Sequence, residues 1–166
     1  MTEPITHDIL CLLAEKFLVK NAFGVVFHDK FKAYTSTGEQ PDCLGFRSGV
    51  SCLIECKTSR SDFLVDKRKK FRADPLLGMG DWRFFLTPVG LIRVEELPTG
   101  WGLLETDGKR INKVYGFPVN TGWFDKPFTG NKQAECDYMY SACRRMVIRG
   151  HLKEIYDGVP VKEIYK

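Results

Sequence analysis

Apolar side chains recur at helical spacing near the beginning of the chain. Within residues 5–21 they form one face, which consists of Ile9, Leu10, Leu13 and Phe17. Steps of three and four residues place side chains on the same side of a helix. Thr6 is the expected N-cap, because its hydroxyl oxygen can accept a hydrogen bond from the first turn. The pattern predicts an amphipathic helix.

A second helical pattern covers residues 131–150. Its apolar stripe advances in steps of four residues and consists of Ala134, Tyr138, Ala142 and Met146. Cys136 and Cys143 lie seven residues apart, a spacing that also suits two core positions. We expect a helix whose stripe packs against the core.

Between these two segments, short runs rich in Val, Ile, Phe and Trp alternate with turn residues. Such runs are typical of β-strands. The expected strands cover residues 22–27, 41–46, 50–57, 82–86, 90–94, 101–105 and 111–117. The polar or glycine- and proline-containing stretches 35–40 and 73–81 are expected to be turns or loops.

The segment 59–72 has helical character and follows the expected strand at residues 50–57. Ser59 or Ser61 can serve as its N-cap. The order is a helix, several strands with one embedded helix, and a terminal helix. It predicts one α/β domain over residues 1–166, with a central mixed sheet flanked by helices. The end of the chain, residues 151–166, has no pattern that places it.

The composition agrees with a globular domain, at 166 residues with 43% hydrophobic and 28% charged side chains. The six cysteines contain no CxxC pair, and no signal peptide precedes them, so we expect free thiols. The apolar run at residues 9–14 is too short to cross a membrane. The expected location is the cytoplasm of a bacterial cell or a phage-infected host, with no membrane partner.

Positive charge is concentrated in one segment, although the net charge of the whole chain is only +4. Residues 57–72 contain seven basic side chains against two acidic ones. A local basic patch attracts a phosphate backbone. The alternative is a solvated helix face.

The residues best suited to catalysis or metal binding are Asp42, which follows Pro41, and the pair Glu55 and Lys57. Alternation along a strand places Glu55 and Lys57 on one face. The opposite, apolar face then consists of Cys52, Ile54 and Cys56. If residues 41–46 pair beside this strand, Asp42 reaches the face of Glu55 and Lys57.

Two converging carboxylates favour a bound cation. Carboxylate oxygens, together with the backbone carbonyl of Cys56, suit Mg²⁺, for which Mn²⁺ can substitute. A bound metal ion lowers the pKa of a coordinated water and stabilises charge on a phosphoryl oxygen. Lys57 can orient or deprotonate that water, or offset the developing charge. The set is sufficient for phosphodiester hydrolysis.

The run from Pro41-Asp42 to Glu55-Cys56-Lys57 resembles the PD-(D/E)xK signature of the restriction-endonuclease-like superfamily. Residues 58–69 resemble the MmcB-like DNA-repair branch and its phage relatives. The positions that match this branch are Ser59, Asp62, Phe63, Asp66, Lys67 and Arg68. With the strands at residues 82–105, the resemblance covers about residues 41–105. It implies a restriction-endonuclease-like fold and a magnesium-dependent deoxyribonuclease in DNA repair, DNA processing or phage DNA metabolism.

The resemblance implies roles for particular residues. Asp42, Glu55 and Lys57 are the expected catalytic set, and Glu15 is a candidate for an additional metal-binding carboxylate. The expected DNA-binding residues are Arg60, Lys67, Lys69, Lys70 and Arg72. The expected supporting residues are Ser59, Asp62 and Asp66. Many enzymes of the superfamily act as dimers, so a homodimer is also compatible with the resemblance.

Each of these assignments has a simpler alternative. Asp42 can cap the turn after Pro41, and Glu55 and Lys57 can form an exposed pair on an edge strand. Glu15 lies away from the apolar helical face, which favours a solvated glutamate. At the level of the whole protein, the alternative is a catalytically silent module that binds DNA or a protein partner.

The three histidines, His7, His28 and His151, have no ligand spacing, so no histidine-based metal site is expected. Trp123 and Phe124 lie in an expected loop near two lysines. Aromatic residues in such a position usually belong to the core, and the alternative is that they stack on bases.

Overall fold

Six short strands form the centre of the protein, and the computed structural model describes them within residues 4–160. They are β1 (Val25–His28), β2 (Cys43–Arg47), β3 (Val50–Cys56), β4 (Trp82–Pro88), β5 (Gly102–Thr106) and β6 (Ile111–Tyr115). Their order in the sheet follows their order in the chain. β3–β4 and β4–β5 pair in parallel, and the other neighbours pair antiparallel. The sheet is therefore mixed, as predicted.

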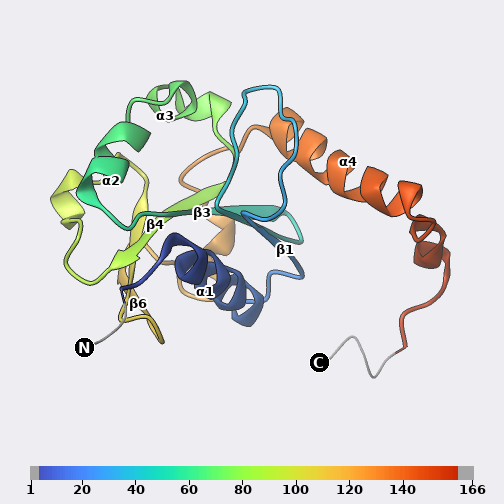
Figure 1. The fold of residues 1–166 in the computed structure, drawn as a ribbon, viewed down its shortest axis with the longest axis horizontal. Helices are drawn as coiled ribbons and strands as arrows, with labels where there is room; N and C mark the ends of the chain where they lie inside the picture. The colour runs from blue at the N-terminus through green and yellow to red at the C-terminus, as the bar shows by residue number, and fades with distance from the viewer. Residues whose placement is uncertain (1–3, 161–166) are drawn as a thin grey trace.

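Helices cover both faces of this sheet (Figure 1). They are α1 (His7–Lys20), α2 (Arg60–Asp66), α3 (Lys70–Ala73) and α4 (Lys132–Ile148). Four short 3₁₀ turns also occur, η1 (Pro75–Leu77), η2 (Val94–Glu96), η3 (Gly122–Phe124) and η4 (Leu152–Tyr156). One apolar cluster contains α1, and the other contains residues of α2 and α4. The predicted α/β architecture, a mixed sheet flanked by helices, is confirmed. None of the helices in the described part of the chain is both long and apolar enough to cross a membrane.

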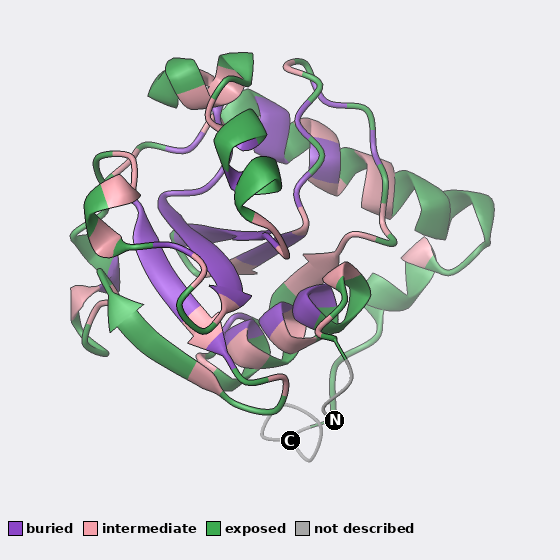
Figure 2. Cartoon of the chain, turned by 60° about the vertical axis from the view of Figure 1, so that its left-hand side comes forward, coloured by how far each residue is buried: buried purple, intermediate pink, exposed green. Residues whose placement is uncertain are grey.

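The strand β3 has both faces buried, and Figure 2 shows the central strands in the colour of buried residues. Cys52, Ile54 and Cys56 belong to the apolar cluster under α1, whereas Leu53 belongs to the cluster under α2 and α4. The predicted alternation is therefore correct. It directs Glu55, two residues after Leu53, away from α1 and toward the side of α2 and α3.

The N-terminal helix forms as expected, but the face that it buries is rotated about the helix axis from the predicted one. The side chain of Thr6 accepts a hydrogen bond from the backbone N–H of Ile9 at 3.3 Å, which confirms the predicted cap. The residues that α1 buries are Leu10, Cys11, Ala14 and Leu18, whereas Ile9 is 36% exposed. Small side chains at two of these positions allow the helix to approach the sheet closely.

Two predictions for the middle of the chain are wrong. Residues 90–94 form a turn that leads into η2 instead of a strand. The predicted helix at residues 59–72 is divided into α2 and α3. Ser59 caps α2 as expected, accepting from the N–H of Asp62 at 3.2 Å. In one continuous helix, residues 66 and 72 would lie about 120° apart around the axis and about 9 Å apart along it. The break instead allows Arg72 to contact Asp66 at 2.9 Å.

The predicted stripe of α4 is buried only in its first half. Ala134 and Tyr138 are fully buried, whereas Met146 is 42% exposed. Cys136 and Cys143, expected in the core, are exposed. The reason is visible in Figure 1, where the second half of α4 extends beyond the sheet. The last part of the predicted domain, residues 161–166, lies outside the described residues.

The first turn of α4 is attached to the sheet by buried polar contacts. Glu135 Oε1 accepts hydrogen bonds from Ser51 Oγ at 2.6 Å and from the backbone N–H of Gly80 at 2.9 Å. Lys132 Nζ lies 2.8 Å from Asp81 Oδ1. These contacts fix the helix against the beginning of β3 and the segment before β4.

We predict that Glu135→Ala destabilises the protein by about 1–3 kcal/mol, because the buried donors of Ser51 and Gly80 lose their acceptor. Chemical denaturation measures the free energy of unfolding. Cys136→Ala, an exposed neighbour on the same helix, is the control and should change it by less than about 0.5 kcal/mol. Equal stability of the two variants would contradict the prediction.

Candidate active site

The three residues of the predicted catalytic set meet at one end of the sheet. Asp42 directly precedes β2, and Lys57 directly follows β3. The antiparallel register pairs Cys43 with Ile54, which places Asp42 beside Glu55. Lys57 Nζ lies 3.2 Å from Glu55 Oε2 and 4.0 Å from Asp42 Oδ2. The sequence pattern thus identified side chains that are neighbours in space.

Asp42 is held by contacts from two elements. Its Oδ2 accepts a hydrogen bond from the backbone N–H of Cys56 at 2.8 Å, and its Oδ1 lies 3.2 Å from His7 Nε2. Burial opposes its charge, but the bond to His7, the charge of Lys57 and the bond from Cys56 lower the pKa of this carboxyl below its ordinary value. The partners of Asp42 thus lie on α1 and on β3, which argues against a role limited to the turn after Pro41.

Glu55 lies in the least favourable position for a charge. Its side chain is 3% exposed, on an interior strand of the sheet. Burial raises the pKa of Glu55 to about 7, and the charge of Arg72 only partly offsets this rise. The nearby carboxylate of Asp42 raises it further. The alternative of an exposed pair on an edge strand is wrong, because both Glu55 and Lys57 are buried.

Lys57 remains a cation in this setting. Burial opposes its charge, but the carboxylates of Glu55, Asp66 and Asp42 outweigh this effect and raise its pKa to about 12. Its Nζ also lies 3.3 Å from Asp66 Oδ1. Such a lysine can orient a water or offset negative charge. It is poorly suited to removing a proton.

Further charged side chains surround Glu55. One of them is Arg72, for which the prediction of DNA binding is wrong. The Arg72 side chain is 2% exposed and reaches Glu39, Glu55 and Asp66 at 2.5, 3.1 and 2.9 Å. It therefore points inward and does not face a DNA backbone. Glu39, which the sequence reasoning did not single out, is fully buried and also accepts from the backbone N–H of Met79 at 2.8 Å.

The other predicted DNA-binding residues divide into two groups. Arg60 forms a 2.6 Å ion pair with Glu96, and Lys67 donates to the backbone carbonyl of Glu96, so both are engaged at the surface. Lys69 is 43% exposed although it contacts Asp66 at 2.8 Å, and Lys70 is exposed. The basic segment thus offers fewer side chains to solvent than its composition indicates.

The predicted supporting residues and Glu15 also have distinct positions. Ser59 caps α2, Asp62 is exposed in its first turn, and Asp66 is buried against Lys57. Glu15 is 36% exposed and contacts His28 at 3.4 Å, so it is not brought into the group around Glu55.

The two aromatic residues of the candidate stacking loop differ in exposure. Trp123 is 2% exposed and packs in the apolar cluster under α1, where its backbone carbonyl accepts a hydrogen bond from Trp82 Nε1 at 2.8 Å. Phe124 is 67% exposed. Base stacking by Trp123 is therefore wrong, and Phe124 alone faces solvent.

One histidine that looked isolated in the sequence, His7, lies close to Asp42. His7 contacts Asp42 and also Asp29, whose Oδ2 is 3.7 Å from His7 Nδ1. The hydrogen bond to Asp42 raises the pKa of His7 to about 9, against the opposing effect of burial. The available signal was the spacing of His7 and Cys11, four residues apart on one helix. Contact with Asp29 depends on the fold and is not visible in the sequence.

The donor set fits a divalent cation that prefers oxygen. Four buried or largely buried carboxylates converge here, those of Glu39, Asp42, Glu55 and Asp66. Their cationic partners are the buried Lys57 and Arg72 and the more exposed His7 and Lys69. Asp66 Oδ1 has two ammonium neighbours, Lys69 Nζ at 2.8 Å and Lys57 Nζ at 3.3 Å. Carboxylate oxygens that converge in a buried place are donors that a hard divalent metal ion binds, and the ion relieves their mutual repulsion.

Comparisons with known proteins support the fold alone. No protein-family model matches the chain, and a search of curated proteins found no match. A solved structure with a similar fold is the SPO1766 protein of unknown function from Silicibacter pomeroyi. It is 21% identical, the similarity covers 96% of this chain and 97% of that one, and the TM-score is 0.55. The chain therefore shares a fold with a bacterial protein whose activity is not known.

We predict that the imidazole of His7 titrates at about pH 9 in the metal-free protein and that Asp42→Asn moves this midpoint down toward 6.5. Because the pKa in the folded state exceeds that in the unfolded state, the contact stabilises the fold most below pH 6.5. This stabilisation is lost as the pH rises through about 9. NMR titration of the histidine resonances measures the midpoint. An unchanged midpoint in Asp42→Asn would show that Asp42 is not the cause.

We predict that Arg72→Met lowers the free energy of unfolding by about 3–5 kcal/mol, because it leaves buried carboxylates without their cation. The control is Lys70→Met, which removes an exposed charge from the same short helix and should change stability by about 0.5 kcal/mol or less. Chemical denaturation compares the two. If Arg72→Met were as stable as the control, the inward network would not contribute to folding.

Proposed function

We propose that this protein is a metal-dependent deoxyribonuclease that hydrolyses DNA phosphodiester bonds. The observation that carries the proposal is the convergence of Asp42, Glu55 and Lys57 at one end of the sheet, within a cluster of four carboxylates and their cationic partners. The resemblance to the PD-(D/E)xK signature supports the same chemistry. It favours a role in DNA repair, DNA processing or phage DNA metabolism.

The proposed roles follow from the position of each side chain. Asp42, Glu55 and the backbone carbonyl of Cys56 would hold Mg²⁺ or Mn²⁺, which prefer oxygen donors. When bound, the metal ion lowers the pKa of a coordinated water and stabilises charge on a phosphoryl oxygen. Lys57, held as a cation by its carboxylate neighbours, orients the attacking water and offsets the negative charge that develops on the phosphate.

Arg72 and Asp66 act behind these residues. Arg72 Nη2 lies 3.1 Å from Glu55 Oε1, and Asp66 Oδ1 lies 3.3 Å from Lys57 Nζ. Each of the two central side chains is therefore fixed by a buried partner of opposite charge. Such partners restrict the side-chain rotamers of Glu55 and Lys57 and keep both groups in the position that the reaction needs. Loss of either partner is expected to misplace the catalytic group.

Contacts to DNA would be made chiefly with the phosphate backbone. Lys69 and Lys70 are the solvent-facing members of the predicted DNA-binding set. Lys69 contacts the cluster through Asp66, and Lys70 follows it in the chain at the beginning of α3. Backbone contacts make binding sensitive to salt and nearly independent of base sequence. Asp66 and Arg72 also line a pocket of about 250 Å³, so the cluster has a side that opens to solvent.

A second candidate function is a catalytically silent module that binds DNA or a protein partner. One observation favours it, because both carboxylate oxygens of Glu55 already have cationic partners, Arg72 on one and Lys57 on the other. Such pairing neutralises the glutamate without a metal ion. In that case Asp42→Asn would leave the function of the protein intact.

The cleavage of single-stranded, duplex and branched DNA tests the choice between the two functions. We predict products with Mg²⁺ or Mn²⁺, no products with EDTA, and a loss of rate of at least about 100-fold in Glu55→Gln. The matched control is Glu95→Gln, an exposed glutamate that should keep the wild-type rate. DNA binding without cleavage in the wild type, under every metal condition, would overturn the nuclease proposal in favour of the silent module.

A further inference from the structure

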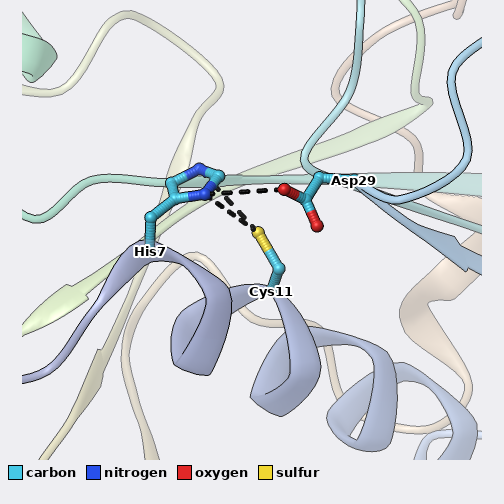
Figure 3. A group of neighbouring side chains, drawn as sticks. All are labelled: His7, Cys11 and Asp29. Atoms are coloured by element: carbon cyan, nitrogen blue, oxygen red, sulfur yellow. Dashed lines mark hydrogen bonds and ion pairs between the residues drawn. The ribbon is translucent and has the colours of Figure 1, made fainter.

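A group of unlike side chains lies beside Asp42 on the outer side of the candidate active site. His7 and Cys11 come from α1, and Asp29 comes from the turn directly after β1 (Figure 3). One donor atom from each of the three residues lies within 4.8 Å of the other two. No histidine-based metal site is expected from the sequence, because this group is assembled only by the packing of α1 against β1 and β2.

Two of the three separations between the donor atoms are close to those around a tetrahedral metal ion. His7 Nδ1 lies 3.6 Å from Cys11 Sγ and 3.7 Å from Asp29 Oδ2. Zinc bonds of about 2.0 Å to nitrogen or oxygen and about 2.3 Å to sulfur place neighbouring tetrahedral donors roughly 3.3–3.6 Å apart. The third separation, between Cys11 Sγ and the Asp29 carboxylate, is within 4.8 Å, so a bound ion would draw these two groups together to complete three corners of one coordination sphere.

We propose that His7, Cys11 and Asp29 form a binding site for a zinc-like transition-metal ion, separate from the magnesium site proposed at Asp42 and Glu55. A nitrogen, a sulfur and an oxygen donor suit Zn²⁺ and ions of similar softness. Mg²⁺ prefers oxygen donors alone, so it would not compete well for this site.

The surroundings of the ligands resemble the supporting shell of a metal site. His7 Nδ1 faces Cys11 and Asp29, while His7 Nε2 lies 3.2 Å from Asp42 Oδ1. A metal-binding histidine commonly donates its second N–H to a carboxylate, which fixes the tautomer and the orientation of the ring. The other oxygen of Asp29 lies 3.4 Å from His28 Nδ1. Both outer ligands are thus oriented by polar partners.

The thiol ligand lies in the interior of the protein. Cys11 is fully buried, and its Sγ lies 3.6 Å from His7 Nδ1. A metal ion binds cysteine in its thiolate form, so binding at this site would release the thiol proton.

The exposure of the group allows an ion to enter and leaves room for a fourth ligand. The side chain of His7 is 40% exposed and that of Asp29 is 20% exposed, whereas Cys11 forms the buried floor. The fourth tetrahedral position therefore faces solvent and would hold a water. A bound ion would connect α1 to the turn after β1 and would fix the ring of His7 against Asp42.

Titration of the metal-free full-length protein with Co²⁺ tests the proposal, because cobalt reports its own ligands. We expect one equivalent to bind with a thiolate-to-cobalt charge-transfer band and tetrahedral visible bands, and Zn²⁺ to displace it. Cys11→Ser should abolish the charge-transfer band and weaken binding at least about tenfold, since loss of a supporting partner alone costs about 10–100-fold. Cys136→Ser, an exposed thiol on α4, is the matched control and should keep the band.

A second variant keeps the test decisive if Cys11→Ser does not fold. Asp29→Asn should weaken Co²⁺ binding at least about tenfold while the thiolate band persists at saturation. Bound Co²⁺ without a thiolate band, or with equal affinity and an equal band in the ligand variants, would overturn the proposal. These measurements record metal binding and spectra, so their outcome does not depend on whether the protein cleaves DNA. Co²⁺ bound only at Asp42 and Glu55 would give no thiolate band, so the two sites can be distinguished.

Discussion

Charge compensation in the buried interior is the constraint on which the candidate active site depends. A buried ion costs several kcal/mol unless a partner of opposite charge lies close and is well oriented. Glu55 is on an interior strand, so its charge requires cations from outside the strand. Lys57 supplies one and Arg72 the other. Arg72 in turn satisfies Glu39 and Asp66, so a single inward guanidinium connects the loop before β2, the strand β3 and the helix α2.

This requirement also explains where the sequence-based prediction succeeded and where it failed. Alternation within β3 was enough to place Glu55 and Lys57 on one face, because that signal is local. The inward turn of Arg72 was not predictable, since a run of basic residues looks the same whether its members face water or buried carboxylates. Glu39 lies 33 positions from its partner Arg72, and its polar loop has no pattern that indicates burial.

The rest of the fold shows the same division between local and distant signals. The caps of α1 and α2 were predictable from single serine or threonine residues. The exposed second half of α4 was not, because an apolar stripe does not reveal how far the sheet beneath it extends. His7 and Cys11 share a helix face, but their approach to Asp29 and Asp42 follows from packing. Asp42 consequently lies between two groups of candidate metal ligands, one of oxygen donors and one of mixed donors.

The central claim is that the carboxylates of Asp42 and Glu55 are arranged to hold a hard divalent cation. Anomalous diffraction from crystals soaked in Mn²⁺ tests it most directly, because the signal locates the ion among its ligands. The account predicts an anomalous peak bound by Asp42, Glu55 and the backbone carbonyl of Cys56, with Lys57 still beside it. A crystal without a peak there, in which Glu55 remains paired with both Arg72 and Lys57, would contradict the account.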